Sequence, residues 1–243
     1  MTRCLVVLAL LVGRQAGANS ASCRSDGWGV ASGSTLPVHP RITFYADSDF
    51  KLPKRARVVA KLDGKDVATK VTYQAAAPFD IATIEIDSDR TGTLELAWQT
   101  RSMTLQHPTA TFTIAPKLAM PSEVHGTASR FHRAYHHSTV RESWDGLAVA
   151  VDANVIEFEV RWRRDASSAW TTLDVPGSTL EDSNVLHLGE ISCTVNFDVP
   201  TLERGIDLEL SAELADGRTL AVTGLPSHVK LDPLPAGTPV SSP

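Results

Sequence analysis

Four histidines lie close together near the middle of the sequence, at positions 125, 132, 136 and 137, and imidazole is a common ligand of transition metals. On a helix, His132 and His136 would share a face and could bind one ion. On a strand their Cα atoms would be about 13 Å apart, too far to share an ion. No cysteine or carboxylate at ligand spacing accompanies them. We therefore expect no metal site and keep His132, His136 and His137 as weak candidates.

The segment Asp87-Ser-Asp-Arg-Thr-Gly92 has oxygen ligands at alternate positions and a glycine at the sixth, like the start of a calcium-binding loop. Its twelfth position, which needs a bidentate glutamate, is Trp98. The segment also lies between two expected strands, where acidic residues and glycine are ordinary turn residues. We interpret it as a turn and expect no cofactor.

Enzyme signatures are missing from the sequence. It contains no G-x-S-x-G, no H-E-x-x-H and no glycine-rich phosphate loop. A catalytic triad is defined by geometry and needs no local motif, so this absence favours a noncatalytic protein without deciding the matter.

Exposed aromatic residues could contact a partner. Trp162 should be a core residue, Trp28 and Trp144 are candidates for exposure, and we place Tyr135 and Trp144 on a possible contact surface.

The first eighteen residues predict export. A short basic start precedes the apolar run Cys4–Gly13, and Ala16-Gly17-Ala18 matches a signal-peptidase site, which gives a signal peptide over 1–18 and a mature start at Asn19. The apolar run is shorter than the roughly 20 residues of a membrane span, and no other stretch approaches that length. Lipidation at Cys23 is the minority interpretation, because Ser20-Ala-Ser22 is not the usual preceding tripeptide. We expect a periplasmic, surface or secreted protein.

Export leaves an acidic chain with two cysteines. Removal of Arg3 and Arg14 leaves 21 basic and 28 acidic residues, a net charge of about −7. Such a surface repels nucleic acid, which we exclude as a partner. Cys23 and Cys193 are the cysteines that survive, and in an oxidising compartment we expect them to form a disulfide.

Short alternating segments with turn signals between them predict an all-β chain. An irregular leader over 19–38 is followed by about seven strands within 39–116, and we interpret 57–73 as one hairpin around Asp63-Gly64. Prolines at 116 and 121 mark a link between domains. A second set of strands follows within 122–232, and the proline-rich tail over 233–243 should be disordered.

The second half contains one strongly alternating segment and one long segment without regular alternation. Strict alternation over 155–163 places Ile156, Phe158, Val160 and Trp162 on one face. Residues 117–145 form the longest irregular stretch after the leader, and within them only 127–142 could form a helix. We look for a contact surface in this stretch, since long connections carry function.

The two halves resemble known families. The motifs Pro40-Arg-Ile-Thr-Phe44, Val59–Gly64 and Thr91–Leu96 resemble bacterial immunoglobulin-like domains of S-layer and envelope proteins. Phe158-Glu-Val-Arg-Trp162, with Trp170 and Leu202–Ala212, looks like a fibronectin type III module, although Ile206 stands where that family has a tyrosine. The resemblances imply two immunoglobulin-like β-sandwiches in tandem.

The same resemblances imply spacing, adhesion or binding rather than catalysis, although a fold does not fix a function. We therefore expect a noncatalytic exported protein whose partner is a protein or a carbohydrate. Two alternatives remain open. One is a periplasmic metal-binding protein that uses the cluster His125–His137, and the other is an enzyme, or an accessory or inhibitor of one.

Overall fold

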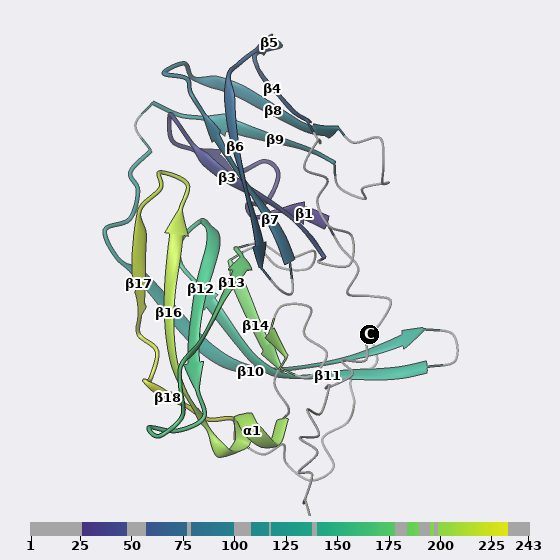
Figure 1. Cartoon of the computed structure of the whole chain (residues 1–243), viewed down its shortest axis with the longest axis vertical. Coiled ribbons are helices and arrows are strands. Elements are labelled where there is room, and N and C mark those ends of the chain that lie inside the picture. The colour runs from purple at the N-terminus through teal and green to yellow at the C-terminus, as the bar shows by residue number, and fades with distance from the viewer. Residues whose placement is uncertain are drawn as a thin grey trace, which may run out of the picture.

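The structure is a computed structural model, and it describes residues 26–47, 57–76, 79–99, 108–116, 118–137, 140–177, 184–189, 195–196 and 199–232. Most of these residues lie in strands, which form two immunoglobulin-like β-sandwiches, one above the other in Figure 1. The all-β prediction is confirmed. Among the described residues, no helix is long and apolar enough to cross a membrane.

The first sandwich has the strand order of an immunoglobulin domain. One sheet has the order β1-β3-β7-β6, and the other has the order β2-β9-β8-β4-β5. The short β2 pairs with β9 in parallel, whereas the other neighbours are antiparallel. The strands are β1 (Asp26–Trp28), β2 (Thr35–Leu36), β3 (Arg41–Asp47), β4 (Arg57–Leu62), β5 (Lys65–Asp66), β6 (Thr69–Ala76), β7 (Phe79–Ile86), β8 (Gly92–Gln99) and β9 (Thr109–Ile114).

An aromatic stack joins the two sheets of the first sandwich. The rings of Phe44 on β3 and Trp98 on β8 lie 4.8 Å apart and nearly parallel, and Trp28 packs edge-on against Phe44 at 4.9 Å. In antibody domains a disulfide links the two strands that correspond to β3 and β8. Trp28 is a core residue, 7% exposed, so β1 and β2 give structure to part of the leader that was expected to be irregular.

The second sandwich has one sheet of β13, β12, β16 and β17 and another of β10, β11, β14 and β15. A short parallel contact of Val124 and His125 on β10 with β17 connects the two sheets, and β18 pairs with β16. The elements are β10 (Val124–His137), β11 (Val140–Val151), β12 (Val155–Arg163), β13 (Thr171–Pro176), β14 (Val185–Gly189), β15 (Val195–Asn196), α1 (Val199–Arg204), β16 (Ile206–Leu214), β17 (Thr219–Thr223) and β18 (His228–Val229).

Two expectations about local structure were wrong, and one helix was not expected. The turn at Asp63-Gly64, where both residues have positive φ, forms a hairpin only between β4 and β5, and β6 pairs with β7 in the other sheet. Residues 124–137 and 140–151 are paired strands, neither irregular nor helical, because the β-formers along them pair in register. The helix that no local pattern predicted is α1, which has a proline near its start and is followed by Gly205 with φ of 98°.

Candidate functional site

The two sandwiches are docked through a β-bulge in β12. The register between β12 and β16 shifts between Val155 and Glu157, which leaves Ile156 as the extra residue. Ile156 is fully buried and belongs to the core of the first sandwich, while Val155 and Phe158 belong to the core of the second. The expectation that Ile156 shares a face with Phe158 is therefore wrong, because the bulge turns its side chain toward the neighbouring domain.

Polar contacts surround this apolar anchor. The hydroxyl of the buried Thr43 donates a hydrogen bond of 2.7 Å to the carbonyl of Ile156, and the amide of Arg41 donates to the carbonyl of Ala215 at 2.7 Å. Gly29 leaves room for the first contact, because a Cβ there would lie 1.9 Å from the Thr43 hydroxyl and 2.3 Å from the Ile156 carbonyl oxygen. These contacts fix the two sandwiches to each other.

Carboxylates gather around the guanidinium of Arg41 beside this anchor. Arg41 Nη1 lies 2.6 Å from Glu213 Oε1 and Arg41 Nε lies 3.8 Å from Glu85 Oε1, while Lys70 pairs with Glu85 at 2.9 Å. Glu157 is the cross-strand partner of Glu213. The acidic joint is our name for the group Arg41, Lys70, Glu85, Glu157, Asp174 and Glu213. Its Asp174 carboxylate accepts a hydrogen bond of 2.5 Å from the amide of Gln74 on β6.

Burial and like charge perturb the acids of the joint. Desolvation, with the charges of Asp174 and Glu213 added to it, raises the pKa of Glu157 from 4.5 to about 8, against the opposing effect of Arg41. Desolvation also raises the pKa of Glu213. In contrast, the hydrogen bond and charge of Lys70 lower the pKa of Glu85. Glu157 is therefore largely protonated at neutral pH.

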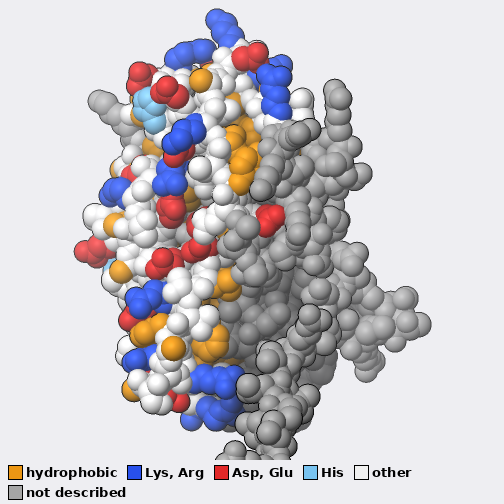
Figure 2. Space-filling model, in the orientation of Figure 1, with side chains coloured by type: hydrophobic (Ala, Val, Ile, Leu, Met, Phe, Trp, Pro, Cys, Tyr) orange, Lys and Arg blue, Asp and Glu red, His pale blue; other side chains and the backbone are white. Residues whose placement is uncertain are grey.

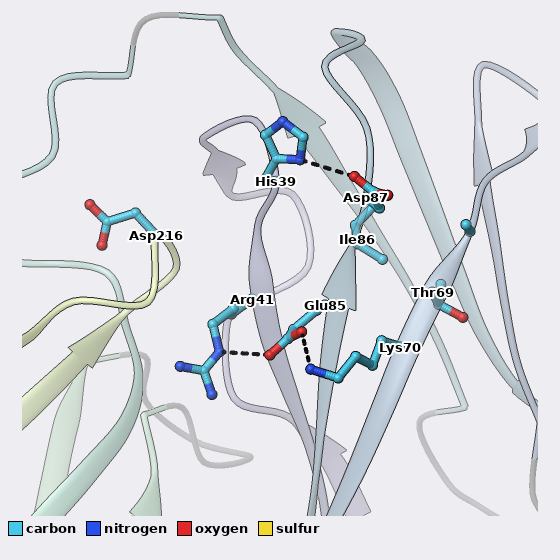
Figure 3. A pocket seen from close by; sticks show the side chains of 9 residues that line it. His39, Arg41, Thr69, Lys70, Glu85, Ile86, Asp87 and Asp216 are labelled. Atoms are coloured by element: carbon cyan, nitrogen blue, oxygen red, sulfur yellow. Dashed lines mark hydrogen bonds and ion pairs between the residues drawn. The ribbon is translucent and has the colours of Figure 1, made fainter.

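A pocket of about 500 Å³ opens beside the joint and is lined from both sandwiches (Figure 3). Its charged side chains are paired with each other or with close neighbours. His39 lies 3.6 Å from Asp87 and 2.7 Å from Asp89, Glu85 is shared by Lys70 and Arg41, and Asp216 is bound by Arg218 at 2.6 Å. The pocket therefore offers no unpaired charge for an ionic ligand. Its lining residues are His39, Arg41, Ala68, Thr69, Lys70, Glu85, Ile86, Asp87 and Asp216.

The long hairpin of β10 and β11 projects beyond the second sandwich (Figure 1). The two strands pair continuously from Gly126–Val151 to His137–Val140. Among the described residues, β14 pairs with β11 only over 146–150 and β17 pairs with β10 only at 124–125. Residues 132–137 and 140–145, which we call the ribbon, thus pair only with each other. At about 3.3 Å per residue the ribbon is about 20 Å long.

The base of the ribbon is fixed to the second sandwich. The guanidinium of Arg130 forms a bidentate ion pair with Asp145 and also donates to the backbone carbonyl of Asp232. The rings of Phe131 and His187 lie 4.7 Å apart. Gly146 on β11 lies against Leu188 and Gly189 on β14 so closely that a Cβ on Gly146 would be 2.3 Å from the Leu188 carbonyl oxygen. The ribbon therefore starts from a rigid base.

The predicted site residues fall mainly on the ribbon. The strand β10 places His132 and His136 four strand residues apart, so the helical spacing considered for them is wrong. Cross-strand register places Tyr135 opposite Glu142, Arg133 opposite Trp144, and His137 opposite Val140. Cys23 and Cys193 lie outside the described residues, as do residues 1–18 and the tail over 233–243.

The basic residues of β12 are engaged in pairs. Arg161 pairs with Glu209 at 2.7 Å and Arg163 with Asp207 at 2.9 Å, and both guanidinium groups lie over the ring of Trp170, at 5.0 and 4.7 Å. Figure 2 shows Lys and Arg side chains intermixed with acidic ones on the face in view, without a continuous basic stripe. Trp162 is half-buried against the second core.

Sequence reasoning missed the acidic joint. Arg41, Glu85, Glu157 and Glu213 occupy outward positions of alternating strands, where charged residues normally contact water. The one available signal was the adjacent apolar pair Val155-Ile156, which breaks the alternation that β12 otherwise follows.

No family model and no curated protein matches this chain. Solved structures that resemble it include the tandem Ig repeats of Dlar, with 13% identity and a TM-score of 0.23 over 82% of this chain and 97% of that one. The N-terminal Ig1-2 module of the Drosophila receptor protein tyrosine phosphatase DLAR has 14% identity and a TM-score of 0.25 over the same shares. The ectodomain of mouse nectin-like molecule 4 has 12% identity and a TM-score of 0.24 over 87% of this chain and 66% of that one. Because these TM-scores are low, we base the immunoglobulin-like assignment on strand order and register.

Proposed function

We propose that this chain is an exported, noncatalytic binding protein, in which two docked sandwiches present the β10–β11 ribbon to a protein or carbohydrate partner. The observation that carries the proposal is the pairing of the ribbon. Beyond their last other neighbours among the described strands, β10 continues over residues 126–137 and β11 over residues 140–145. A two-stranded hairpin is only marginally stable alone, so a partner that covers it adds stability as well as contact area.

The composition of the ribbon supports this proposal. Tyrosine, tryptophan and arginine are enriched at protein interfaces, and the ribbon contains Tyr135, Trp144, Arg133 and Arg141. In the register of β10 and β11, Arg133 lies opposite Trp144 and Tyr135 lies opposite Glu142. This set of aromatic and charged residues suits a partner with apolar and charged groups.

The domain assignment also belongs to the proposal. We place the first domain at 39–116, with β1 and β2 as additions before it, and the second at 122–232. In the second sandwich, the strand orders β10-β11-β14 and β17-β16-β12-β13 support a fibronectin type III-like module. The envelope type of the first domain rests on the sequence resemblance alone. Export rests on the signal peptide over 1–18.

Site-specific photo-crosslinking in the producing cells tests the proposal. A photoreactive amino acid at position 135 or 144 should give one shared covalent adduct, and the same group at Arg90, an exposed turn residue of the first sandwich, should not. A variant with residues 133–144 replaced by Asn-Gly keeps the His132–Asp145 register. It should no longer bind the protein found in the adduct, while both sandwiches stay folded. Equal adducts from position 90 would contradict the proposal.

A further inference from the structure

The acidic joint contains more negative than positive charge. In the described part of the chain, Arg41 and Lys70 are its cations, and Glu85, Glu157, Asp174 and Glu213 are its carboxylates. Two positive charges therefore meet four ionisable acids, and full ionisation would leave a net charge of −2. The acids Glu157, Asp174 and Glu213 come from the second sandwich, whereas both cations come from the first.

The cations are already committed to other acids. Lys70 is bound to Glu85, and Arg41 is in contact with Glu213 and Glu85. Arg41 Nε is a buried donor without an aligned hydrogen bond to any described residue, but the charge of its guanidinium is already shared by Glu213 and Glu85. An ionised Glu157 would therefore have no cation of its own among the described residues of the joint.

We propose that this joint is a proton-operated connection, which holds the two sandwiches rigidly while Glu157 carries a proton and loosens when Glu157 is ionised. This inference goes beyond the proposed binding function and does not depend on it. Loosening would change the direction in which the ribbon points relative to the first sandwich.

The position of Glu157 makes it the residue that decides the state of the joint. It is half-buried, directly follows the bulge residue Ile156, and lies opposite Glu213 in the register of β12 and β16. No described residue forms a hydrogen bond or ion pair with its carboxyl group, whereas Asp174 has Gln74 and Glu213 has Arg41. Ionisation would thus place an unpaired charge next to the anchor between the domains.

In addition to desolvation, three charges act on the Glu157 carboxyl: Asp174 on β13 and Glu213 on β16 raise its pKa, and Arg41 on β3 lowers it. The nearby Glu85 on β7 and Lys70 and Gln74 on β6 pair with Arg41, Glu85 and Asp174, and Glu159 on β12 is exposed. The acids outnumber the cations on this list. The balance therefore opposes ionisation of Glu157, in agreement with its pKa of about 8.

The direction of the pH effect follows from this raised pKa. When the sandwiches separate, Glu157 returns to water and to its usual pKa of 4.5. The docked form consequently binds more protons between pH 4.5 and about 8, so docking weakens as pH rises through this range. The contribution of Glu157 to docking is complete below pH 4.5 and is lost above pH 8.

Amide hydrogen exchange at the joint tests the proposal in the full exported chain. The Arg41 amide reports docking, because it donates to the Ala215 carbonyl of the other sandwich, and the Leu96 amide in β8 reports the integrity of the first sandwich. After correction for intrinsic exchange, the protection of Arg41 should fall by roughly tenfold or more between about pH 6 and pH 9. The protection of Leu96 should change much less.

Two variants and one control complete the test. Glu157→Gln should keep Arg41 protected across the whole range. Asp174→Asn removes a negative charge that raises the pKa of Glu157, so the loss of protection should move to lower pH. Glu159→Gln, on the same strand but exposed, should behave like the wild type. The same pH dependence in wild type and Glu157→Gln, or a parallel loss at Arg41 and Leu96, would overturn the proposal.

Discussion

The hydroxyl of Thr43 in the first sandwich donates a 2.7 Å hydrogen bond to the carbonyl of Ile156 in the second, and both residues are buried. This carbonyl also accepts a 3.0 Å hydrogen bond from the amide of Gly177, so one peptide group serves both domains. The bulge that exposes the carbonyl also directs the Ile156 side chain into the neighbouring core. Docking of the domains and local strand geometry therefore depend on the same residue.

Removal of the Thr43 hydroxyl should weaken this docking. Thr43→Val keeps the shape of the side chain and leaves the Ile156 carbonyl with one donor, at a cost of about 1–2 kcal/mol in the free energy of unfolding. Thr72→Val is the matched control, because Thr72 is an exposed threonine on β6 of the same sheet. Urea denaturation measures both. Equal changes in the two variants would show that the interdomain hydrogen bond contributes nothing.

Truncation of Ile156 should cost more. Ile156→Ala removes a fully buried side chain from the core of the first sandwich, and we expect a loss of about 2–4 kcal/mol in the free energy of unfolding. The half-buried Leu220 on β17 provides the control variant Leu220→Ala, with a smaller loss. If Ile156→Ala were the milder of the two by denaturation, the interdomain anchor would be contradicted.

Acid should destabilise the second sandwich through Asp207. Hydrogen bonds from His228 and Arg163 lower the pKa of Asp207, so its contribution to stability is present above the usual carboxyl pKa and is lost as pH falls through the lowered value. Asp207→Asn should therefore flatten the acid limb of a plot of unfolding free energy against pH. The basic limb, which Glu157 sets, should keep its slope. An unchanged acid limb would remove Asp207 from this account.

Cys23 and Cys193 should form a disulfide in the exported protein. They are the two cysteines outside the signal peptide proposed for residues 1–18, and the bridge closes a loop of about 170 residues, for which chain entropy gives an upper value of about 5 kcal/mol. Non-reducing peptide mapping should recover the linked peptides, with a reduced sample as control. Two free thiols would contradict the bridge, and a dimer on a non-reducing gel would indicate an intermolecular bond.

The ribbon histidines should not bind metal tightly. At strand spacing His132 and His136 are about 13 Å apart, too far to share one ion. Calorimetric titration with Cu(II) or Zn(II) should show no stoichiometric submicromolar site. Such a site in the wild type, lost in His132→Ala or His136→Ala, would favour the metal-binding alternative over the binding protein proposed here.

Local patterns predicted the strands better than their partners. Alternation over 155–163 predicted β12, and Asp63-Gly64 predicted a turn, because side-chain period and backbone preference are local properties. The departure of β6 to the other sheet depends on packing across the first core. The acidic joint depends on contacts between residues more than 100 positions apart, such as Gln74 and Asp174, which no local pattern encodes.

The stack of Phe44 on Trp98 affects the conditions under which the first sandwich can fold. The three cysteines of the chain lie at positions 4, 23 and 193, outside the strands β1–β9. The two sheets are therefore joined by packed aromatic rings instead of by a disulfide. Neither an oxidant nor a disulfide isomerase is needed to close this core. The first sandwich should fold equally well in reducing and oxidising media, and before or after the chain has been exported.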